Sequence, residues 1–472
     1  MSALPRTMTR PHAAAEPLPR RIAVLGFARS GRALAEALVE RGVSVAVADV
    51  RSEKELSGVE ELRRRGVEFF LGDSGTEFLE GADWLAVSPG VPLTVPPVAA
   101  ARERGIPVLA EVEIAFRIAE AESPGENRWV AITGTNGKST TTAWIAEILK
   151  RAGRPVALAG NIGSPLSGFL ETRESRDFVC ELSSFQLEAI DRFRPHVAVL
   201  TNITPDHLDR YADFSDYAAA KARIFENQEP ADFAVVNADD PASAAIEVPS
   251  RRVLFSRRGR PETRGAAAWL EGGEIIWGEG NSRRSVVAAS ELALPGAHNL
   301  ENAMAVLAAA ECLATPAAAI LDTLTRFEGL PHRSQLVASS GGVRWVDDSK
   351  GTNVDATAKS LEGYPDGSVI LILGGRDKHG DFAALADLVG KRARLVLTIG
   401  EAAGTIEAAL AGRATVERRF TMEQAVARAR EVAKPGDTIL LSPACASFDQ
   451  YKNFEERGRH FAVLARAAAA AE

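Results

Sequence analysis

Residues 132–141 hold the feature that most constrains this chain, a glycine-rich loop between an apolar run and a helical one. They read Ile-Thr-Gly-Thr-Asn-Gly-Lys-Ser-Thr-Thr. Small residues let backbone N–H groups close around phosphate oxygens, and the N-terminus of the following helix adds a positive dipole. Lys138 would contact the β- and γ-phosphates, and Ser139 or Thr140 would offer a hydroxyl to Mg²⁺. The loop therefore predicts a strand–loop–helix unit that binds a nucleoside triphosphate, although Ile132 stands where the general pattern has its first glycine. A glycine-rich turn with a solvated lysine fits this context less well.

The totals of the chain indicate a globular protein of several domains. At 472 residues it is too long for one core and suggests about three domains. A net charge of -8 argues against nucleic-acid binding, and no apolar run reaches the ~20 residues that span a bilayer. We expect residues 1–20, which lack the apolar core of a signal peptide, and the alanine-rich end 467–472 to be disordered. Three widely spaced cysteines form neither a disulfide framework nor a zinc site, so a reduced, cytoplasmic protein without membrane contact is expected.

Strand-like and helical segments alternate nearly throughout, which favours parallel sheets covered by helices. The polar residues 121–127 join a first block to the block of the glycine-rich loop, and a third block begins near residue 329. Residues 251–290 suggest a small strand-rich insertion or subsheet, before a helix at 299–313. The predicted strands are 21–25, 43–48, 82–87, 129–132, 177–181, 197–201, 344–346, 369–373, 395–399 and 438–441.

The first block carries a weakened dinucleotide fingerprint. Its loop has Gly26, Ala28 and Gly31 at the G-x-G-x-x-G positions, and Asp49 follows about 20 residues later as a candidate ribose acid. Ala28 stands where a second glycine would permit close approach to a pyrophosphate. A dehydrogenase, a protein for a different nucleotide and a merely structural turn remain alternatives, since any diphosphate can use the helix N-terminus.

Polar side chains follow two strands of the second block, where an open parallel sheet places its ligands. Glu181 is placed to hold Mg²⁺ on phosphate oxygens, although a helix N-terminal acid is the simpler alternative. His207 would sit across from Glu181 on the neighbouring strand end; the alternative is a helix cap by Asp206 with a surface histidine.

Three further polar residues of this block have ordinary alternatives. By local pattern alone, Lys221 looks like a solvated helix lysine. Asn299 and Asn302 share one helix face at i,i+3 spacing, so they either contact an adenine edge or cap the helix.

Four polar loops follow turns or strand ends of the third block. They are 332–333, 347–353, 374–378 and 442–449. Four such loops at one sheet are unusual for mere connectors, and they predict a site for an anionic substrate. Arg333, Lys350 and Lys378 would supply its positive charge.

Taken together, these segments resemble the Mur ligase family, ATP-dependent amide-forming enzymes of peptidoglycan precursor synthesis. The resemblance covers the chain outside residues 1–20 and the short tail. Its last segment is typical of members that add D-glutamate, and the Asn-Pro-Arg-type loop of relatives that add a diamino acid is absent from the sequence. The segments that carry it are 134–140, 181–188, 204–211, 329–333, 348–353 and 442–458.

The resemblance implies an α/β fold of three domains, each a sheet covered by helices. A Rossmann-like domain at 21–115 would hold UDP, a central P-loop ATPase-like domain at 116–328 would hold ATP and Mg²⁺, and a C-terminal Rossmann-like domain at 329–472 would close over ATP and bind D-glutamate. The substrates implied are UDP-N-acetylmuramoyl-L-alanine, D-glutamate and ATP, with an acyl-phosphate intermediate and release of ADP and phosphate. We expect a monomer that binds no nucleic acid.

The resemblance also assigns residues. Those with a chemical role would be Lys138, Glu181, His207, Lys221 and Lys350. The ATP site would comprise Gly134, Thr135, Asn136, Gly137, Lys138, Ser139, Thr140, Asn299, Asn302, Arg333, Asp348 and Lys350. The UDP-substrate site would comprise Arg29, Ser30, Asp49, Arg51, Ser88, Gly90, Asn161, Ser183 and Gln186. D-Glutamate would meet Thr352, Lys378, Ser447 and Phe454. Two Mg²⁺ ions are implied, one held by Ser139 and Glu181, the other by His207 and Lys221.

For Lys221 the resemblance overturns the solvated-face interpretation. The family uses an N-carboxylated lysine there, and a carbamate oxygen is a hard anionic ligand whereas an ammonium is not. Two departures remain: Ala28 replaces a glycine, and either Arg376 or Asp377 fills the family's acidic position.

Three rival functions remain. Folylpolyglutamate synthetase shares the ATP-binding core but has no reason for the nucleotide-binding block before it. A nicotinamide-dependent oxidoreductase fused to an ATPase would rest on the first loop and Asp49. A P-loop switch protein would bind nucleotide without ligase chemistry.

Overall fold

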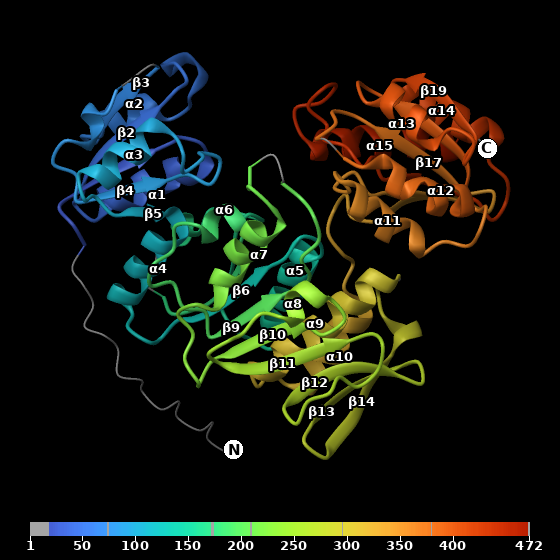
Figure 1. Ribbon diagram of the computed structural model, residues 1–472, viewed down its shortest axis with the longest axis horizontal. Helices are drawn as coiled ribbons and strands as arrows, with labels where there is room; N and C mark the ends of the chain where they lie inside the picture. The colour runs from blue at the N-terminus through green and yellow to red at the C-terminus, as the bar shows by residue number, and fades with distance from the viewer. Residues whose placement is uncertain are drawn as a thin grey trace. The chain divides into compact units, whose positions relative to one another are not determined.

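The computed structural model describes residues 18–72, 75–170, 174–207, 210–294, 296–378 and 380–470. They contain three sheets and fall into two compact units (Figure 1). The first two sheets lie in one unit, which comprises residues 1–203, 211–287 and 304–323. The third sheet lies in the other, which comprises 204–210, 288–303 and 324–472. The predicted α/β class is confirmed.

The first sheet is entirely parallel, with the strand order β3-β2-β1-β4-β5. Successive side chains along a strand point to opposite faces of the sheet. In β1, Ile22 and Val24 therefore pack into one core while Ala23 and Leu25 pack into another. Helices therefore cover both faces. The elements are β1 (Arg21–Leu25), α1 (Arg29–Glu40), β2 (Ser44–Asp49), η1 (Glu53–Glu55), α2 (Val59–Arg64), β3 (Glu68–Leu71), η2 (Glu77–Leu79), β4 (Trp84–Val87), α3 (Pro96–Glu103) and β5 (Val108–Ala110).

The central sheet has nine strands in the order β14-β13-β12-β11-β10-β9-β6-β8-β7. Residues 251–290 are strand-rich as predicted, but they extend this sheet and form no separate subsheet, because β11 pairs in parallel with β10 and β12 with β11. The strands are β6 (Arg128–Thr133), β7 (Val156–Gly160), β8 (Asp177–Glu181), β9 (Val197–Leu200), β10 (Phe233–Asn237), β11 (Arg251–Ser256), β12 (Ala266–Glu271), β13 (Glu274–Glu279) and β14 (Ser282–Ala288).

Helix α4 (Glu111–Glu122) leads from the first sheet to the central one. Its buried side chains, among them Val112 and Ile118, belong to a core that also contains Ile22 of the first sheet and Trp129 of the central sheet. The polar stretch 121–127 therefore begins inside the packed helix α4, and only residues 123–127 form the connection to the central sheet. The other helices of this region are α5 (Lys138–Arg151), η3 (Leu166–Phe169), α6 (Ser184–Leu187), α7 (Phe214–Ala222), η4 (Arg223–Phe225), α8 (Pro241–Ala244), η5 (Ala289–Glu291), α9 (Ala297–Cys312) and α10 (Ala317–Arg326).

The third sheet has the order β15-β16-β20-β17-β18-β19 and is parallel except for its edge strand β15. Helices α14 and α15 pack on one face and α11 to α13 on the other, which explains the unbroken apolar run of β17. The elements are β15 (Gln335–Ser340), β16 (Val343–Asp347), α11 (Val354–Glu362), β17 (Val369–Gly374), η6 (Phe382–Leu385), α12 (Ala386–Arg392), β18 (Ala393–Ile399), α13 (Ala403–Leu410), β19 (Val416–Phe420), α14 (Met422–Val432), β20 (Thr438–Leu441) and α15 (Phe454–Ala470).

The end of the chain departs from the expectation. Residues 467–470 were expected to be disordered, but they complete α15, and Ala465 and Ala468 are buried beside Phe461. Alanine has the highest helix propensity, so a run of alanines continues a packed helix readily. Residues 1–17 and 471–472 lie outside the described residues.

Candidate functional site

Six of the residues expected to bind the UDP substrate lie at the carboxyl ends of three adjacent strands, β2, β1 and β4. Helix α1 begins at Arg29 and takes up half of the predicted first loop, residues 29–31 of 26–31. A Cβ on Gly31 would lie 1.9 Å from the carbonyl oxygen of Gly26, so only glycine permits this strand–helix approach. Ser88 donates its hydroxyl to the same carbonyl at 2.7 Å, and Gly90 follows in the turn after β4. Arg29 donates to the carbonyl of Gly163 in the central domain at 2.7 Å.

Asp49, the candidate ribose acid, is bound within the protein. Its carboxylate accepts hydrogen bonds from the backbone N–H groups of Phe27 and Arg51, at 2.6 and 2.9 Å, and a two-pronged contact from the Arg51 guanidinium. Burial alone would raise the pKa of Asp49, but the Arg51 side chain and the two N–H groups outweigh it and lower the pKa to about 2. Asp49 therefore fixes the first loop and orients Arg51.

The glycine-rich loop at 134–137 is held open by neighbouring backbone and side chains. Gly134 has φ +143°, and the N–H groups of Thr135 and Asn136 bond to the backbone and side-chain oxygens of Asn202, at 2.8 and 3.0 Å. Thr201 donates its hydroxyl to the carbonyl of Asn136 at 2.6 Å. Because α5 begins at Lys138, its N-terminus faces the loop as predicted, and the hydroxyls of Ser139 and Thr140 lie buried in its first turn.

Lys221 is buried beside this loop, so the solvated-face interpretation is wrong. Only 2% of it is exposed, and its Nζ donates to the carbonyl of Gly134 at 2.8 Å. Lys138 donates to the same carbonyl at 2.9 Å and to that of Thr135 at 2.8 Å. The Tyr217 ring lies 4.5 Å from the Lys221 Nζ, and its hydroxyl lies 3.2 Å from Thr135 Oγ1. The local pattern failed because a buried lysine and a solvated one can occupy the same helical sequence.

Glu181 lies at the end of β8, directly beside β6, the strand that leads into the loop. It is 2% exposed, and Asn161 donates to its Oε1 at 3.0 Å. A buried carboxylate and the Ser139 hydroxyl are oxygen donors of the kind that Mg²⁺ takes, so the chemistry of this donor set fits the implied ion. The described residues contain no group of three or more His, Cys, Asp or Glu side chains placed to hold a metal ion.

The expected relation between Glu181 and His207 needs correction. Strands β8 and β9 are not neighbours, because β6 lies between them. His207 belongs to the second unit, with φ +55°, and its N–H donates to Asp206 at 2.9 Å. Among the helices that the structure describes, none begins at Asp206: α7 begins after Asp213, whose side chain accepts the N–H of Asp216. Leu208 and Asp209 lie outside the described residues.

Ser183 and Gln186 form a capping box at the start of α6. The Ser183 hydroxyl accepts the backbone N–H of Gln186 at 3.3 Å, and the side-chain Oε1 of Gln186 accepts the backbone N–H of Ser183 at 3.0 Å. Both expected substrate-binding residues thus also stabilise a helix terminus.

The four polar loops of the third sheet lie at one edge, as predicted. Strands β16, β20 and β17 are adjacent and parallel, and antiparallel β15 starts opposite the end of β16, with Gln335 paired to Asp347. This arrangement places 332–333, 348–353, 375–378 and 442–449 together. Lys350 Nζ lies 4.1 Å from the Phe454 ring. Thr352 and Ser447 lie in two of these loops, and Lys378 is exposed in a third.

Buried polar groups hold this edge together. Arg457 is 1% exposed and donates to the Ser349 hydroxyl, the Ser349 carbonyl and the Cys445 carbonyl, at 2.9, 2.8 and 3.1 Å. Burial raises the pKa of Asp348 to about 6, although it accepts bonds from the Ser442 hydroxyl and the Ser334 N–H. A carboxyl with a raised pKa at an expected ATP contact fits a functional position.

Four more residues had alternative roles in the sequence analysis, and the structure gives their surroundings. Asn299 and Asn302 are both 5% exposed, and Asn302 donates to Asn299 at 3.4 Å, so the two share one helix face as expected. Arg376 is exposed and pairs with Glu401 at 3.2 Å, while Asp377 accepts the N–H of Gly380 at 2.9 Å. All three cysteines are free. Among the described residues, no helix has the length and apolar character needed to cross a membrane.

Comparison with known proteins accounts for all three sheets. The Mur ligase MurD-like N-terminal domain matches residues 20–110, the Mur ligase middle domain 132–310, and the Mur ligase glutamate ligase domain 332–445. A UDP-N-acetylmuramoylalanine--D-glutamate ligase of Pelotomaculum thermopropionicum is 46% identical over 94% of this chain and 96% of its own. The protein of the same name from Syntrophotalea carbinolica is 44% identical over 94% and 96%. The chain belongs to the Mur ligase family.

Solved structures of other Mur ligases share the fold. The MurF ligase of Thermotoga maritima in complex with ADP has a TM-score of 0.62 at 16% identity, over 91% of this chain and 95% of that one. A pseudomurein peptide ligase type C from Methanothermus fervidus gives 0.57 at 22% identity, over 90% and 96%.

Several residues that shape the site of this Mur ligase lie in segments noted from the sequence but were given no role there. Thr201 and Asn202 hold the glycine-rich loop by hydrogen bonds, and Tyr217 packs on Lys221. Tyr217 precedes Lys221 by four residues, which places both on one helix face, and this spacing could have suggested the pair. The buried Arg457 lies in a helix after the last loop, and only its burial distinguishes it from a surface arginine.

Proposed function

We propose that this Mur ligase uses ATP to join D-glutamate to UDP-N-acetylmuramoyl-L-alanine, making a precursor of peptidoglycan. The observation that carries this function is similarity along the whole chain, which spans the N-terminal, middle and glutamate ligase domains at up to 46% identity. The match at residues 20–110 also disfavours folylpolyglutamate synthetase, which has no reason for such a domain. We keep the division into domains at 21–115, 116–328 and 329–472 as part of the proposal.

The reaction proceeds in two steps. The γ-phosphate of ATP is transferred to the terminal carboxylate of the UDP substrate, and the amine of D-glutamate then attacks the acyl phosphate and displaces phosphate. The N-terminus of α5 binds the β- and γ-phosphates, while the N–H groups of Thr135 and Asn136 stay bonded to Asn202 and hold the shape of the loop. Lys138 supplies a positive charge there. When ATP binds, its ammonium group donates to phosphate oxygens in place of the carbonyls of Gly134 and Thr135.

Mg²⁺ would supply further positive charge to the transferring phosphate. Ser139 and Glu181 would hold one ion, a role supported by their burial beside the loop. His207 and Lys221 would hold the second, with Lys221 as a carbamate. The burial of Lys221 supports that form. Carboxylation would replace the buried ammonium of Lys221 by an anionic carbamate, whose oxygens are the kind of ligand that Mg²⁺ takes.

The three substrates have proposed contacts on all three sheets and their helices. Arg29, Ser30, Asp49, Arg51, Ser88, Gly90, Asn161, Ser183 and Gln186 serve the UDP substrate. Asn299, Asn302, Arg333, Asp348 and Lys350 serve ATP, and Thr352, Lys378, Ser447 and Phe454 serve D-glutamate. The shared edge of the third sheet supports the contacts from Arg333, Asp348, Lys350, Thr352, Lys378 and Ser447. A cytoplasmic monomer stays a prediction.

Phosphate release and product mass test this function directly. The purified chain is incubated with ATP, Mg²⁺, UDP-N-acetylmuramoyl-L-alanine and D-glutamate, with single omissions and L-glutamate as controls. We expect phosphate and the D-glutamyl product only in the complete mixture. Folded protein that forms no product with saturating substrates would exclude the ligase function.

A further inference from the structure

Residues 188–193, here called the 188–193 loop, connect α6 to β9 and are bound on two sides. On one side, Glu113 of α4 accepts the N–H groups of Asp191, Arg192 and Phe193, at 3.0, 3.0 and 2.8 Å. Glu113 is 0% exposed, so these bonds are shielded from water. The N–H of Ala110, the last residue of β5, donates to the carbonyl of Ala189 at 2.7 Å. The first domain thus reaches this loop through two consecutive elements.

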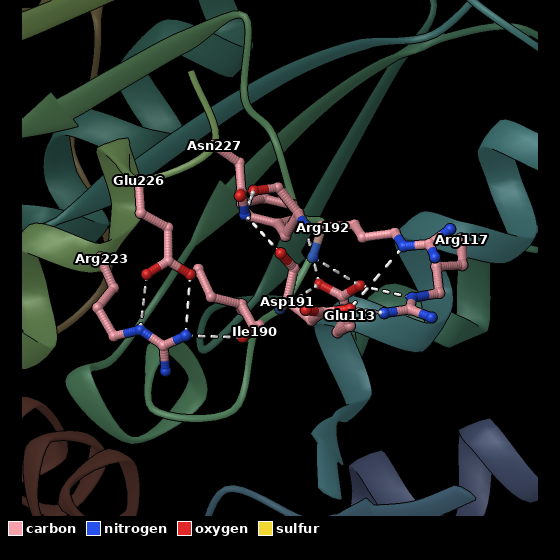
Figure 2. A network of polar contacts seen from close by, with 9 residues as sticks. Glu113, Arg117, Ile190, Asp191, Arg192, Arg223, Glu226 and Asn227 are labelled. Carbon is pink, nitrogen blue, oxygen red and sulfur yellow. Dashed lines mark hydrogen bonds and ion pairs between the residues drawn. The ribbon is translucent and has the colours of Figure 1, made fainter. Parts of the chain in front are cut away.

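On the other side, the turn after α7 donates to the carbonyls of the same loop (Figure 2). The guanidinium of Arg223 bonds to the carbonyls of Glu188 and Ile190, the latter at 2.8 Å. Asn227 donates to the carbonyls of Asp191 and Phe193, at 3.0 and 3.2 Å. Because N–H groups and carbonyls of the loop backbone are both hydrogen-bonded to neighbouring elements, these bonds hold the loop in one position.

Arg223 lies two residues after Lys221 in one continuous helical segment. At about 100° per residue, their side chains leave the helix in nearly opposite directions. Lys221 therefore reaches the Gly134 carbonyl on one side while Arg223 reaches the 188–193 loop on the other. The turn that carries Lys221 is fixed between the phosphate-binding loop and the 188–193 loop.

We propose that Arg223, Asn227 and Glu113 are positioning residues for Lys221, acting through the 188–193 loop. This inference rests on the proposed function, in which Lys221 acts at the transferring phosphate. Without the Arg223 bonds, the Lys221 turn loses its support opposite the phosphate-binding loop. A displacement of about 1 Å at a reacting centre can cost on the order of a hundredfold in rate.

Arg223→Gln is the main test, with Glu226→Gln as its matched control. Glu226 is exposed and pairs with the Arg223 guanidinium at 2.9 Å, so the control removes that ion pair but keeps the carbonyl contacts. We expect Arg223→Gln to lower kcat about tenfold to a hundredfold, with little change in KM for ATP. Glu226→Gln should stay within about twofold of the parent, since exposed ion pairs contribute little. Arg223→Lys, which keeps a donor cation, should recover part of the loss.

Hydrogen exchange of residues 214–227 gives a readout independent of turnover. Exchange there should quicken in Arg223→Gln and stay unchanged in Glu226→Gln. If Arg223→Gln does not fold, Asn227→Ala is the second variant, and it should lower kcat several-fold with faster exchange in the same segment.

Two results would overturn the inference. One is a folded Arg223→Gln protein, or Asn227→Ala in its place, with the kcat of the Glu226→Gln control. The other is a loss that lies in KM alone while exchange at 214–227 stays at the parent level. If the parent itself shows no D-glutamate-dependent turnover, the proposed function fails, and the exchange experiment still decides whether Arg223 holds the Lys221 turn.

Discussion

Replacing Glu113 with glutamine should loosen the 188–193 loop strongly while leaving its shape nearly intact. The carboxylate has four donors: Oε2 accepts the N–H groups of Asp191 and Phe193, and Oε1 accepts the N–H of Arg192 and, at 2.6 Å, the Nε of Arg117. A glutamine side chain has one oxygen in place of two. In either amide orientation, its NH₂ group points at two of these donors.

The cost follows from which donors lose their acceptor. In one orientation of the amide, the N–H groups of Asp191 and Phe193 face the NH₂ group and lose their acceptor. In the other orientation, the N–H of Arg192 and the Arg117 guanidinium lose theirs. A buried donor without an acceptor costs about 1–3 kcal/mol, more when it is charged. Arg117 keeps its contact with the half-exposed Asp191 carboxylate, which lessens its share. We therefore expect Glu113→Gln to lower the free energy of local opening by about 2–4 kcal/mol.

Hydrogen exchange at Asp191, Arg192 and Phe193 measures this directly and requires no two-state unfolding of a large chain. At about 1.4 kcal/mol per factor of ten, exchange of these amides should quicken roughly 30-fold to 1,000-fold. Glu126→Gln, which removes an exposed carboxylate between α4 and β6, is the control and should leave these rates unchanged. Parent-like exchange in folded Glu113→Gln would refute the reasoning, because it would mean that the carboxylate does not hold these N–H groups.

Three further predictions concern the site itself. Lys221→Ala should lose most ligase activity and regain part of it with added short carboxylic acids, which can replace a carbamate as ligand; full activity in a turnover assay would contradict the carbamate proposal. Gly134→Ala should abolish ATP binding in calorimetry, since its Cβ would lie 2.0 Å from Thr201 Oγ1 at a φ of +143°, and unchanged affinity would show that the loop can adopt another shape. The pKa of Asp348 is raised to about 6 from an unfolded value near 3.8, so its contribution favours the fold at low pH and is lost as pH rises through about 6. Asp348→Asn should remove this loss, which reaches up to about 3 kcal/mol, so urea unfolding of variant and parent should diverge from about pH 4 to about pH 6.5 and keep a constant difference above that; a difference that does not change with pH would contradict the assignment.

The strands and the strand–loop–helix unit at 128–151 could be predicted because their signals are local. β6 and α5 flank the loop as their apolar patterns require, and β8 and β20 begin and end at the predicted residues. Short or half-buried strands such as β3, β15 and β19 contain at most three apolar residues in a row and were missed. The alanines at 467–470 were misjudged because composition alone does not show that Phe461 and Ala465 anchor their helix in a core.

The sequence by itself determined which chemistry the chain carries: a loop of small residues for phosphate, carboxylates after strands, and the segments that resemble Mur ligases. These properties reside in contiguous residues, so their order in the chain is enough. Only the tertiary structure decided which neighbours each side chain has. Strand order places β6 between β8 and β9, and burial brings Lys221 to a carbonyl 87 residues away in sequence. Glu113 looks like any helix glutamate until the fold places three backbone N–H groups around it. Burial and pairing depend on contacts between distant segments, and no local pattern contains them.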